Sequence, residues 1–302
     1  MGVRIPYYLF STFLFQSGVR VPSKRILITA DLDEPGFDVW TKKLMDMLSE
    51  AHIPLTLFCT NELQGGRESY AALRRIVDFA GRNNVTLEIA SHSIRHESLA
   101  HTDLPHVIAT IQKSITSFRR QGIPVCGFRA PYLSTEGRYR QVLKEMSTRD
   151  GIILYDSSTL FEGNLFVSRI HDFLRYKPPH DVADIWELPI SCLDDYHLFT
   201  KLRRTEDFVC QYWRRKVDVS LRKYNYFLLL LHPDVIGIHL SALEALLLHC
   251  KRAHPTVSYT TCLKLVEELN VWNKRRSNCE NEDLHDKPAS AEETNGEVPD
   301  NA

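Results

Sequence analysis

The sequence lacks several features that would place it in a specialised class of protein. Its seven cysteines form no Cys-x-x-Cys pair, and their odd number and scattered spacing favour neither a cysteine zinc site nor a disulfide framework. No apolar run is long enough to cross a bilayer, so we predict no integral membrane span. The 13 glycines and 14 prolines among 302 residues exclude a collagen-like chain. We expect mostly free thiols in a reducing compartment.

The chain also lacks an excess of charge of either sign. Its 37 lysines and arginines balance 38 aspartates and glutamates, for a formal net charge of −1. Such a chain produces no long-range field that would attract phosphate backbones or anionic lipid, so we expect neither nucleic acid nor a membrane surface as partner. With 43% apolar and 25% charged residues, the composition is that of a globular protein with a sizeable core.

The two ends differ from the body of the chain. Residues 1–24 include an apolar stretch after Arg4 that loosely resembles a signal peptide, although Pro6 interrupts it and no typical cleavage site follows. The alternatives are an export signal and an extra packed segment; the thiols agree better with a cytoplasmic location. Residues 273–302 contain almost no large apolar side chain, which predicts a disordered acidic tail.

Between these ends, β-branched runs alternate with amphipathic stretches of helical period. We predict strands at 25–31, 55–60, 85–90, 125–129, 152–155, 185–190 and 226–231. Helices are predicted at about 37–51, 67–83, 104–121, 135–148, 205–223, 239–252 and 260–271. Strands separated by helices indicate βαβ units and a parallel sheet, and seven in succession favour an α/β barrel that is closed or nearly closed.

Titratable residues follow four of these strands. Asp31 and Asp33 lie at the end of the first strand, and His92 and His96 follow the third. Arg129 ends the fourth strand, and His232 follows the last. In α/β barrels, catalytic groups lie at the carboxyl ends of strands, so these side chains are candidates for one site.

Two histidines and a carboxylate form a common metal-ligand set. His92 and His96, spaced i and i+4, could face one way from a helical turn and bind one ion, with Asp31 or Asp33 as third ligand and the other aspartate as base. The alternatives are a polar surface turn for the histidines and an N-cap before the 37–51 helix for the aspartates.

The remaining candidates also have two interpretations. Arg129 could hold Asp31 ionised and oriented, or form a purely structural ion pair. His232 could be an ordinary core histidine or, with a carboxylate partner, a general acid. Trp186 could lie in the core or line a pocket, and Asp194 and Asp195 could be plain solvated charges in a loop.

The motifs carry a family resemblance over residues 25–272. T-A-D-L-D-E, H-S-I-R-H, F-R-A-P-Y, W-E-L-P-I-S-C-L-D-D-Y and L-L-L-L-H-P-D occur in the order typical of polysaccharide deacetylases, also known as NodB-like proteins or family-four carbohydrate esterases. The spaced Asp-x-Asp and the L-D-D and H-P-D-V-I-G segments resemble a branch with peptidoglycan-deacetylase-like proteins and hydrolases of allantoin or cyclic imides.

The resemblance implies a distorted (β/α) barrel of about seven parallel strands and a divalent metal, usually zinc, with cobalt, nickel or manganese as alternatives. It implies these roles: metal ligation by Asp33, His92 and His96; general base Asp31, oriented by Arg129; oxyanion stabilisation by the backbone N–H of Tyr132; general acid His232; and an acetyl-pocket wall at Trp186. Asp194 and Asp195 are implied at the substrate site, and one of them, or Asp184, would support His232.

The implied activity is metal-dependent hydrolysis of amide C–N bonds that are not peptide bonds. The first expectation is N-deacetylation of an amino sugar or polysaccharide of the chitooligosaccharide or peptidoglycan type. The alternatives are hydrolysis of small cyclic amides on the same scaffold and a non-catalytic carbohydrate-binding relative. The expected partner is therefore a carbohydrate or a small amide.

Overall fold

The computed structural model describes the chain in seven stretches, which are residues 19–33, 38–62, 70–99, 102–133, 153–159, 178–182 and 185–285. The predicted helix at 135–148 lies outside them, as do Glu34, Asp184 and most of the N-terminal apolar segment. The chain divides into two compact units, Met1–Val266 and Glu267–Ala302. The candidate residues all belong to the first unit.

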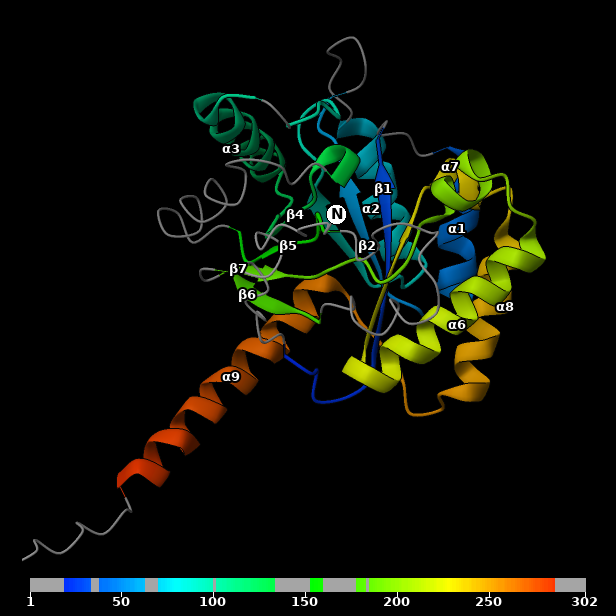
Figure 1. Cartoon of the computed structure of the whole chain (residues 1–302). Helices are drawn as coiled ribbons and strands as arrows, with labels where there is room; N and C mark the ends of the chain where they lie inside the picture. The colour runs from blue at the N-terminus through cyan, green and yellow to red at the C-terminus, as the bar shows by residue number, and fades with distance from the viewer. Residues whose placement is uncertain are drawn as a thin grey trace, which may run out of the picture. The chain divides into compact units, whose positions relative to one another are not determined.

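A single sheet forms the centre of the first unit, as Figure 1 shows. Its neighbouring strands follow the order β6-β7-β5-β4-β3-β2-β1-β8. The parallel strands are β1 (Arg25–Leu32), β2 (Leu55–Cys59), β3 (Leu87–Ser91), β4 (Gly127–Phe128), β5 (Tyr155–Asp156), β7 (Ile185–Glu187) and β8 (Tyr226–Leu231). All seven predicted strands are confirmed, and so is the α/β class.

Two further strands are too short to leave a periodic pattern in the sequence. β6 (His180–Val182) pairs antiparallel with β7, and β9 (Ser258–Tyr259) pairs with the first two residues of β1. The sheet is mostly parallel and strongly curled into a distorted half-barrel. β7 and β8 are not paired in the sheet, but the segment after β7 contacts β8. The backbone N–H of Ser191 donates to the carbonyl of Leu228 at 2.9 Å.

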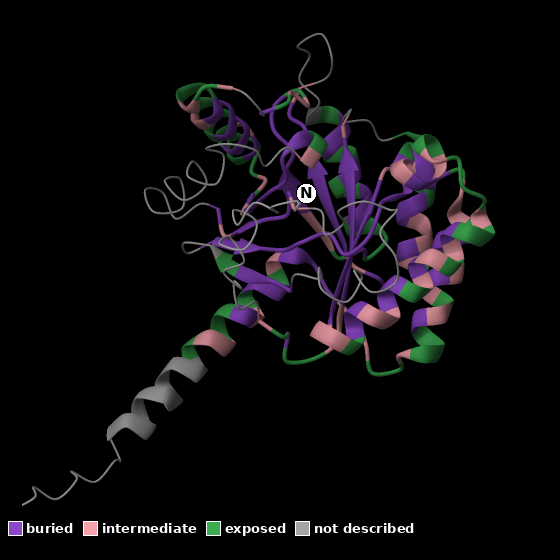
Figure 2. Cartoon of the chain, viewed as in Figure 1, coloured by how far each residue is buried: buried purple, intermediate pink, exposed green. Residues whose placement is uncertain are grey.

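Helices cover the outer face of the sheet and bury its apolar side chains. They are α1 (Val39–Glu50), α2 (Tyr70–Arg82), α3 (Leu104–Arg120), α6 (Glu206–Tyr224), the short α7 (Pro233–Ile236) and α8 (Leu240–Ala253). Alternate residues of β1, such as Ile26, Ile28 and Ala30, join one core cluster with side chains from α1, α2, α6 and α8. Figure 2 shows the strands almost wholly buried and the exposed residues on the outward sides of α6 and α8.

The other face of β1 is polar toward its carboxyl end. Thr29 and Asp31 alternate with the helix-facing residues and are buried inside the curled sheet. Arg129, which follows β4, is fully buried beside them and lies over the ring of Phe58 with its Cζ 3.8 Å from the ring centroid. The interior of the half-barrel therefore contains buried charge that must be paired.

The helix at the end of the chain is longer than predicted. α9 runs from Cys262 to His285, whereas the predicted helix ends at 271 and the predicted disordered tail begins at 273. Residues 273–285 contain neither proline nor glycine, so no strong helix breaker interrupts α9 in this stretch. Residues 286–302 lie outside the described residues.

The described start of the chain is hydrogen-bonded to the turn between α6 and β8. Val21 donates its backbone N–H to the carbonyl of Tyr224 at 3.0 Å and accepts a hydrogen bond from the Asn225 side chain at 2.9 Å. Six cysteines are free thiols, as predicted; they are Cys59, Cys126, Cys192, Cys210, Cys250 and Cys262. In the part of the chain that the structure describes, no helix has the length and apolar character needed to cross a membrane.

Candidate active site

The strand-end residues gather at one end of the half-barrel. Asp31 is the next-to-last residue of β1. His92 follows β3, Arg129 follows β4 and His232 follows β8. Because these strands are parallel and hydrogen-bonded in register, their carboxyl ends lie at the same edge of the sheet. The fold therefore brings together side chains that are two hundred residues apart in the sequence.

Asp33, His92 and His96 form the first group of metal-ligand side chains. The Oδ1 of Asp33 lies 3.5 Å from Nε2 of His92 and 3.3 Å from Nε2 of His96. One ligand atom from each residue falls within 4.8 Å of the other two. Two imidazoles and one carboxylate at this spacing match the three protein ligands of a catalytic zinc site with one open position.

The hydrogen-bonding pattern of this group fits a cation. Nδ1 of His92 lies 2.9 Å from the carbonyl oxygen of Arg129, which can only accept, so Nδ1 carries the proton. In the neutral ring, Nε2 then directs a lone pair toward the carboxylates of Asp31 and Asp33. Oδ1 of Asp33 is buried and accepts no hydrogen bond from the described residues. A divalent ion would satisfy both groups.

The electrostatics of the group agree with metal ligation. Burial would raise the pKa of Asp33, but the neighbouring His92, His96 and His232 lower it below its ordinary value. Burial lowers the pKa of His96, and this effect exceeds the opposite influence of Asp33. Near neutral pH the aspartate is thus ionised and the histidine neutral, which are the forms that bind metal.

The two histidines do not share a helical turn, and that prediction is wrong. The chain between them makes an irregular turn in which Ser93 and His96 have positive φ angles of 71° and 58°. This backbone is strained for residues other than glycine, and it is what turns His96 back toward His92. Their ring centroids are 5.1 Å apart. The alternative N-cap role for Asp31 and Asp33 is also excluded, because Asp38 caps α1.

Arg129 organises the buried side of the site. Its Nη1 donates to Oδ1 of Asp31 at 2.7 Å, and its Nη2 donates to the hydroxyls of Thr29 and Ser157 at 3.1 and 2.9 Å. Nε donates to the carbonyl of Ser157 at 3.0 Å. The predicted partnership of Arg129 with Asp31 is therefore present in the structure. The other oxygen of Asp31, Oδ2, lies 3.6 Å from Nε2 of His92, beside the metal-ligand group.

His232 follows β8, the strand beside β1, and its position is fixed by Asp195. Nδ1 of His232 donates to Oδ1 of Asp195 at 2.8 Å, and the backbone N–H of His232 donates to Oδ2 at 2.9 Å. Burial would lower the pKa of His232, but the hydrogen bond and the charge of Asp195 raise it to about 10. This imidazole therefore remains protonated at neutral pH and can donate a proton.

The adjacent aspartate has a different partner. Asp194 accepts a 2.7 Å hydrogen bond from Nδ1 of His197, at the start of a π-helix (Tyr196–Lys201). Both carboxylates are buried, and each hydrogen-bonds a histidine. In the structure each of the two carboxylates orients an imidazole, and the role of Asp194 and Asp195 at the substrate site stays a prediction. Of the three candidates to support His232, Asp195 does so, and Asp184 lies outside the described residues.

Tyr132 and Trp186 occupy contrasting environments. Tyr132 has a φ of 58°, its side chain is 68% exposed, and its ring centroid is 4.5 Å from that of His96. The oxyanion role of its backbone N–H, which the resemblance implies, stays a prediction. Trp186 lies in β7 and is only 3% exposed, so it presents little surface to a ligand.

The polar residues at the end of β5 and directly after it were not predicted as site residues. Ser157 binds Arg129, and Ser158 accepts a 2.8 Å hydrogen bond from the backbone N–H of Ala130 while donating to Asp156 at 2.5 Å. All three polar side chains of this stretch, Asp156, Ser157 and Ser158, are buried. The signal was available, since a run of three polar residues directly after a predicted strand lies where this fold places functional groups.

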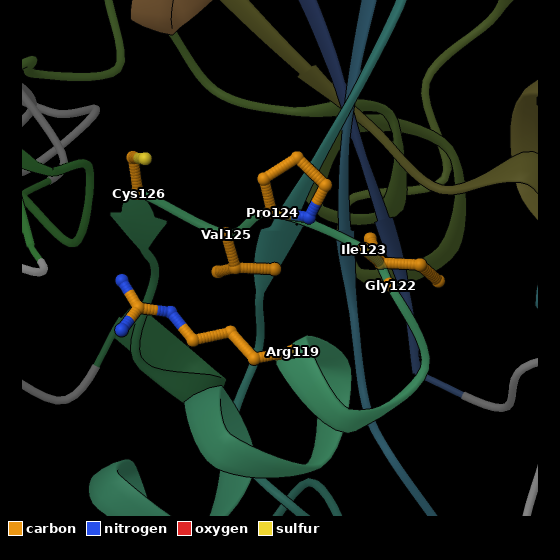
Figure 3. Close-up of a pocket in the computed structure, with 6 residues that line it drawn as sticks. All are labelled: Arg119, Gly122, Ile123, Pro124, Val125 and Cys126. Carbon is orange, nitrogen blue, oxygen red and sulfur yellow. The ribbon is translucent and has the colours of Figure 1, made fainter.

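A hollow of about 380 Å³ opens at the other end of β4 (Figure 3). It lies between the end of α3 and the start of β4, and it is lined by Arg119, Gly122, Ile123, Pro124, Val125 and Cys126. None of the candidate residues contributes to it. It is therefore separate from the strand-end group.

Comparisons with known proteins agree with this geometry. Residues 18–150 match the sequence profile of the family described as polysaccharide deacetylase, whereas no curated protein matches the chain. Among solved structures, a suggested polysaccharide deacetylase from Mycobacterium smegmatis has 21% sequence identity and a TM-score of 0.65, over 82% of this chain and 91% of its own. An allantoinase has 16% identity and a TM-score of 0.61, over 82% and 90%.

A third solved structure is a carbohydrate esterase family four pseudoenzyme from Bacillus anthracis, with 13% identity and a TM-score of 0.51 over 82% of this chain and 67% of its own. Likeness at these identities establishes the fold, and the arrangement of the site must be argued from this chain's own residues. Residues 18–150, a stretch that includes Asp33, His92 and His96, are therefore similar to the polysaccharide deacetylase family.

Proposed function

We propose that this protein is a metal-dependent hydrolase of amide C–N bonds, and that it removes N-acetyl groups from an amino sugar or its polymer. One observation carries the proposal: Asp31, a buried carboxylate fixed by Arg129, lies 3.6 Å from a histidine of the metal-ligand group. A base held this close to a metal site is the arrangement that hydrolysis by an activated water requires.

Asp33, His92 and His96 would hold the ion. A divalent metal such as zinc supplies Lewis acidity there, which makes water a better nucleophile and polarises the amide carbonyl. The carbonyl of Arg129 fixes the ring of His92, so that its Nε2 is directed to the ion. The irregular turn with its positive φ angles keeps His96 on the same side.

Asp31 would take the proton from the attacking water. Its Oδ1 is engaged by Arg129, and its Oδ2 is the oxygen directed toward His92. The guanidinium keeps the carboxylate ionised and prevents it from rotating, which preserves a free oxygen for the proton. Thr29 and Ser157 accept further hydrogen bonds from Arg129, which helps to offset the cost of burying this cation.

His232 would return a proton to the departing nitrogen. Attack of water on the carbonyl and cleavage of the C–N bond leave an amine that departs poorly as an anion, so a protonated donor is needed. Asp195 raises the pKa of His232 to about 10 and so provides that donor at neutral pH. The backbone N–H of Tyr132 would donate to the oxyanion. The products are acetate and a free amine.

The proposal is tested by separating metal ligands from proton-transfer groups. Acetate release from N-acetylglucosamine oligomers and bound metal per chain are measured for Asp33→Asn, His96→Ala, Asp31→Asn and His232→Gln. We expect the first two to lose one bound ion and activity together, and the last two to keep the ion and lose activity by about two orders of magnitude or more. His106→Ala, in the exposed first turn of α3, is the histidine control.

Two outcomes would contradict the proposal. His96→Ala that keeps both its full metal content and its full activity would exclude this group as the catalytic centre. Wild-type protein with a bound ion at this group and no acetate release from any N-acetylated sugar would exclude deacetylation. Circular dichroism of each variant shows whether the fold is retained.

A second candidate is hydrolysis of small cyclic amides. The observation that favours it is the close structural likeness to an allantoinase, whose TM-score of 0.61 is only slightly below that of the suggested deacetylase at 0.65. The same groups serve this reaction, because ring opening also needs a base at the water and a donor at the nitrogen. Allantoin and hydantoin are therefore assayed beside the sugars with the same variants. Ring opening without acetate release would favour this candidate.

A non-catalytic carbohydrate-binding role is the remaining alternative. The fold accommodates a pseudoenzyme, so it does not by itself imply turnover. Against this role, the chain retains both halves of the proton-transfer machinery, the Arg129–Asp31 pair and the Asp195–His232 pair. Tight binding of chitooligosaccharide by metal-loaded protein, with no turnover of any amide, would support it.

A further inference from the structure

A second group of metal-ligand side chains lies on the helices that cover the outer face of the sheet. Asp218 lies in α6, His249 lies in α8, and His254 caps the C-terminal end of α8. Oδ1 of Asp218 lies 2.8 Å from Nε2 of His249 and 2.7 Å from Nε2 of His254. We propose that these three side chains form a second metal site, which binds a divalent transition-metal ion of the zinc type and ties α6 to the end of α8.

The geometry is close to that of a bound ion. One ligand atom from each of the three side chains lies within 4.8 Å of the other two. Zinc bonds of about 2.0–2.2 Å in a tetrahedral site separate neighbouring ligand atoms by roughly 3.3 Å. The two N···O distances must therefore lengthen by roughly half an ångström, which small rotations of partly exposed side chains provide.

The chemistry of the donors selects the type of ion. Two imidazoles and one carboxylate suit zinc, cobalt, nickel or copper, whereas calcium and magnesium prefer oxygen ligands alone. The side chains of His249 and Asp218 are 24% and 34% exposed, so water can reach the site and supply a fourth ligand. The ion can also enter without movement of the helices.

The charge of the group favours a cation. Oδ1 of Asp218, which belongs to the one carboxylate among the three side chains, lies within 2.8 Å of both imidazoles. Within the described residues, no lysine or arginine forms an ion pair with Asp218; its ion-pair partners are the two histidines. A divalent ion bound by the three side chains would compensate the negative charge of the carboxylate.

This group is separate from the candidate active site. α6 and α8 lie side by side (Figure 1), and their buried residues pack on the outer face of the sheet. The active-site residues lie instead at the carboxyl ends of the strands. α6 leads directly into β8, and the end of α8 leads into β9, so an ion here would stabilise the pairing of two helices rather than act on substrate.

Zinc binding to the full chain in a His96→Ala background tests the proposal, because that substitution weakens the first site. Isothermal titration with zinc alone gives the stoichiometry, and cobalt absorption reports tetrahedral nitrogen and oxygen ligation. We expect about one ion per chain, and a loss of affinity of at least about tenfold on adding either His249→Gln or Asp218→Asn.

The matched control is His239→Gln. His239 also joins α8 to α6 through a carboxylate, with its Nδ1 2.8 Å from Oε1 of Glu206. Among the described residues, no second histidine forms an ion pair with Glu206. We expect it to leave zinc affinity unchanged. Absence of zinc binding in the His96→Ala background, or binding that neither His249→Gln nor Asp218→Asn weakens, would overturn the proposal and leave a simple hydrogen-bonded cluster. Thermal melting confirms that each variant is folded.

Discussion

Asp195 accepts two hydrogen bonds from His232, one from Nδ1 at 2.8 Å and one from the backbone N–H at 2.9 Å to its second oxygen. The carboxylate is completely buried, whereas the imidazole retains 17% of its exposure. Both oxygens of Asp195 therefore contact His232, and Oδ1 also accepts a 2.8 Å hydrogen bond from the backbone N–H of Tyr196. This fixes the position of the histidine at the end of β8 and leaves its Nε2 available for a substrate.

Asp195→Asn should shift the alkaline limb of the pH–activity profile to lower pH. Asp195 raises the pKa of His232 to about 10, so the protonated donor persists at neutral pH and is lost as the pH rises through that value. The amide removes the negative charge and lowers the pKa of His232 toward its ordinary value. As the pH rises, kcat/KM for amide hydrolysis should therefore begin to decline at a lower pH in this variant than in the wild type.

Asp194→Asn is the matched control for that experiment. Asp194 is the adjacent buried carboxylate, but its side chain binds His197 rather than His232. We expect only a small displacement of the alkaline limb. Equal displacement by the two substitutions, or none by Asp195→Asn, would show that His232 is not the group that controls this limb.

Gly127→Ala should destabilise the protein. A Cβ atom at Gly127, in β4, would lie 2.0 Å from Cζ of Tyr155 in the neighbouring strand β5. The ring of Tyr155 is fully buried and cannot move aside freely. We expect the free energy of unfolding, measured by urea denaturation, to fall by about 1–3 kcal/mol, as is usual for overpacking.

Gly81→Ala should stabilise the protein. Gly81 lies near the end of α2, and a Cβ atom there would meet nothing within 4 Å. Alanine costs less conformational entropy than glycine in a helix, so the free energy of unfolding should rise by about 0.5–1 kcal/mol. A Gly127→Ala protein as stable as the wild type would contradict the close packing of β4 against β5.

Sequence periodicity predicted most of the fold, because long amphipathic helices and buried strands leave strong patterns. The strand from Arg25 and the strand from Tyr226 begin where they were predicted. β6 and β9 were missed, since strands of two or three residues are specified by tertiary pairing rather than by local sequence. The predicted end of α9 is too early because the prediction relied on an apolar stripe, which residues 273–285 lack.

The candidate site was predictable in its members and less so in its contacts. Strand-end positions identified Asp31, His92 and His232, because parallel strands bring their carboxyl ends together. The sequence could not distinguish Asp195 from Asp194 as the partner of His232, since adjacent side chains diverge according to the local backbone. The positive φ angle of His96 was equally invisible, because left-handed backbone is rarely expected outside glycine.

Arg129→Met should cost much of the stability of the protein. Arg129 and Asp31 form a buried ion pair at 2.7 Å, and removal of the cation leaves the carboxylate buried without its partner. Loss of one member of such a pair typically lowers the free energy of unfolding by about 3–5 kcal/mol. Lys42→Met, which breaks the exposed pair of Lys42 with Asp46 in α1, should cost only about 0.3–0.5 kcal/mol. Urea denaturation of both variants measures the difference, and equal effects would contradict the structural importance of the Arg129–Asp31 pair.

Zinc should stabilise the protein through the first metal-ligand group, and this effect should persist to mildly acidic pH. Binding to the native state alone adds about 2.7 kcal/mol when the free ion is at one hundred times its Kd, which raises Tm. Protons compete with the ion for the histidines. Burial lowers the pKa of His96 from its ordinary value of 6.5, so this ligand remains neutral to a lower pH than a free imidazole would.

Differential scanning fluorimetry is done in a His249→Gln background, which removes one ligand of the second proposed metal site. The rise in Tm with zinc then reports on the first metal-ligand group, Asp33, His92 and His96. We expect the rise in Tm with zinc to be reversed by a chelator and to decline only below about pH 6.5, the ordinary pKa of histidine. His96→Ala should abolish the rise, whereas His106→Ala should keep it, because His106 is exposed on α3. An equal rise in Tm in the His96→Ala protein would place the stabilising ion elsewhere and remove the main support for a metal at the ends of the strands.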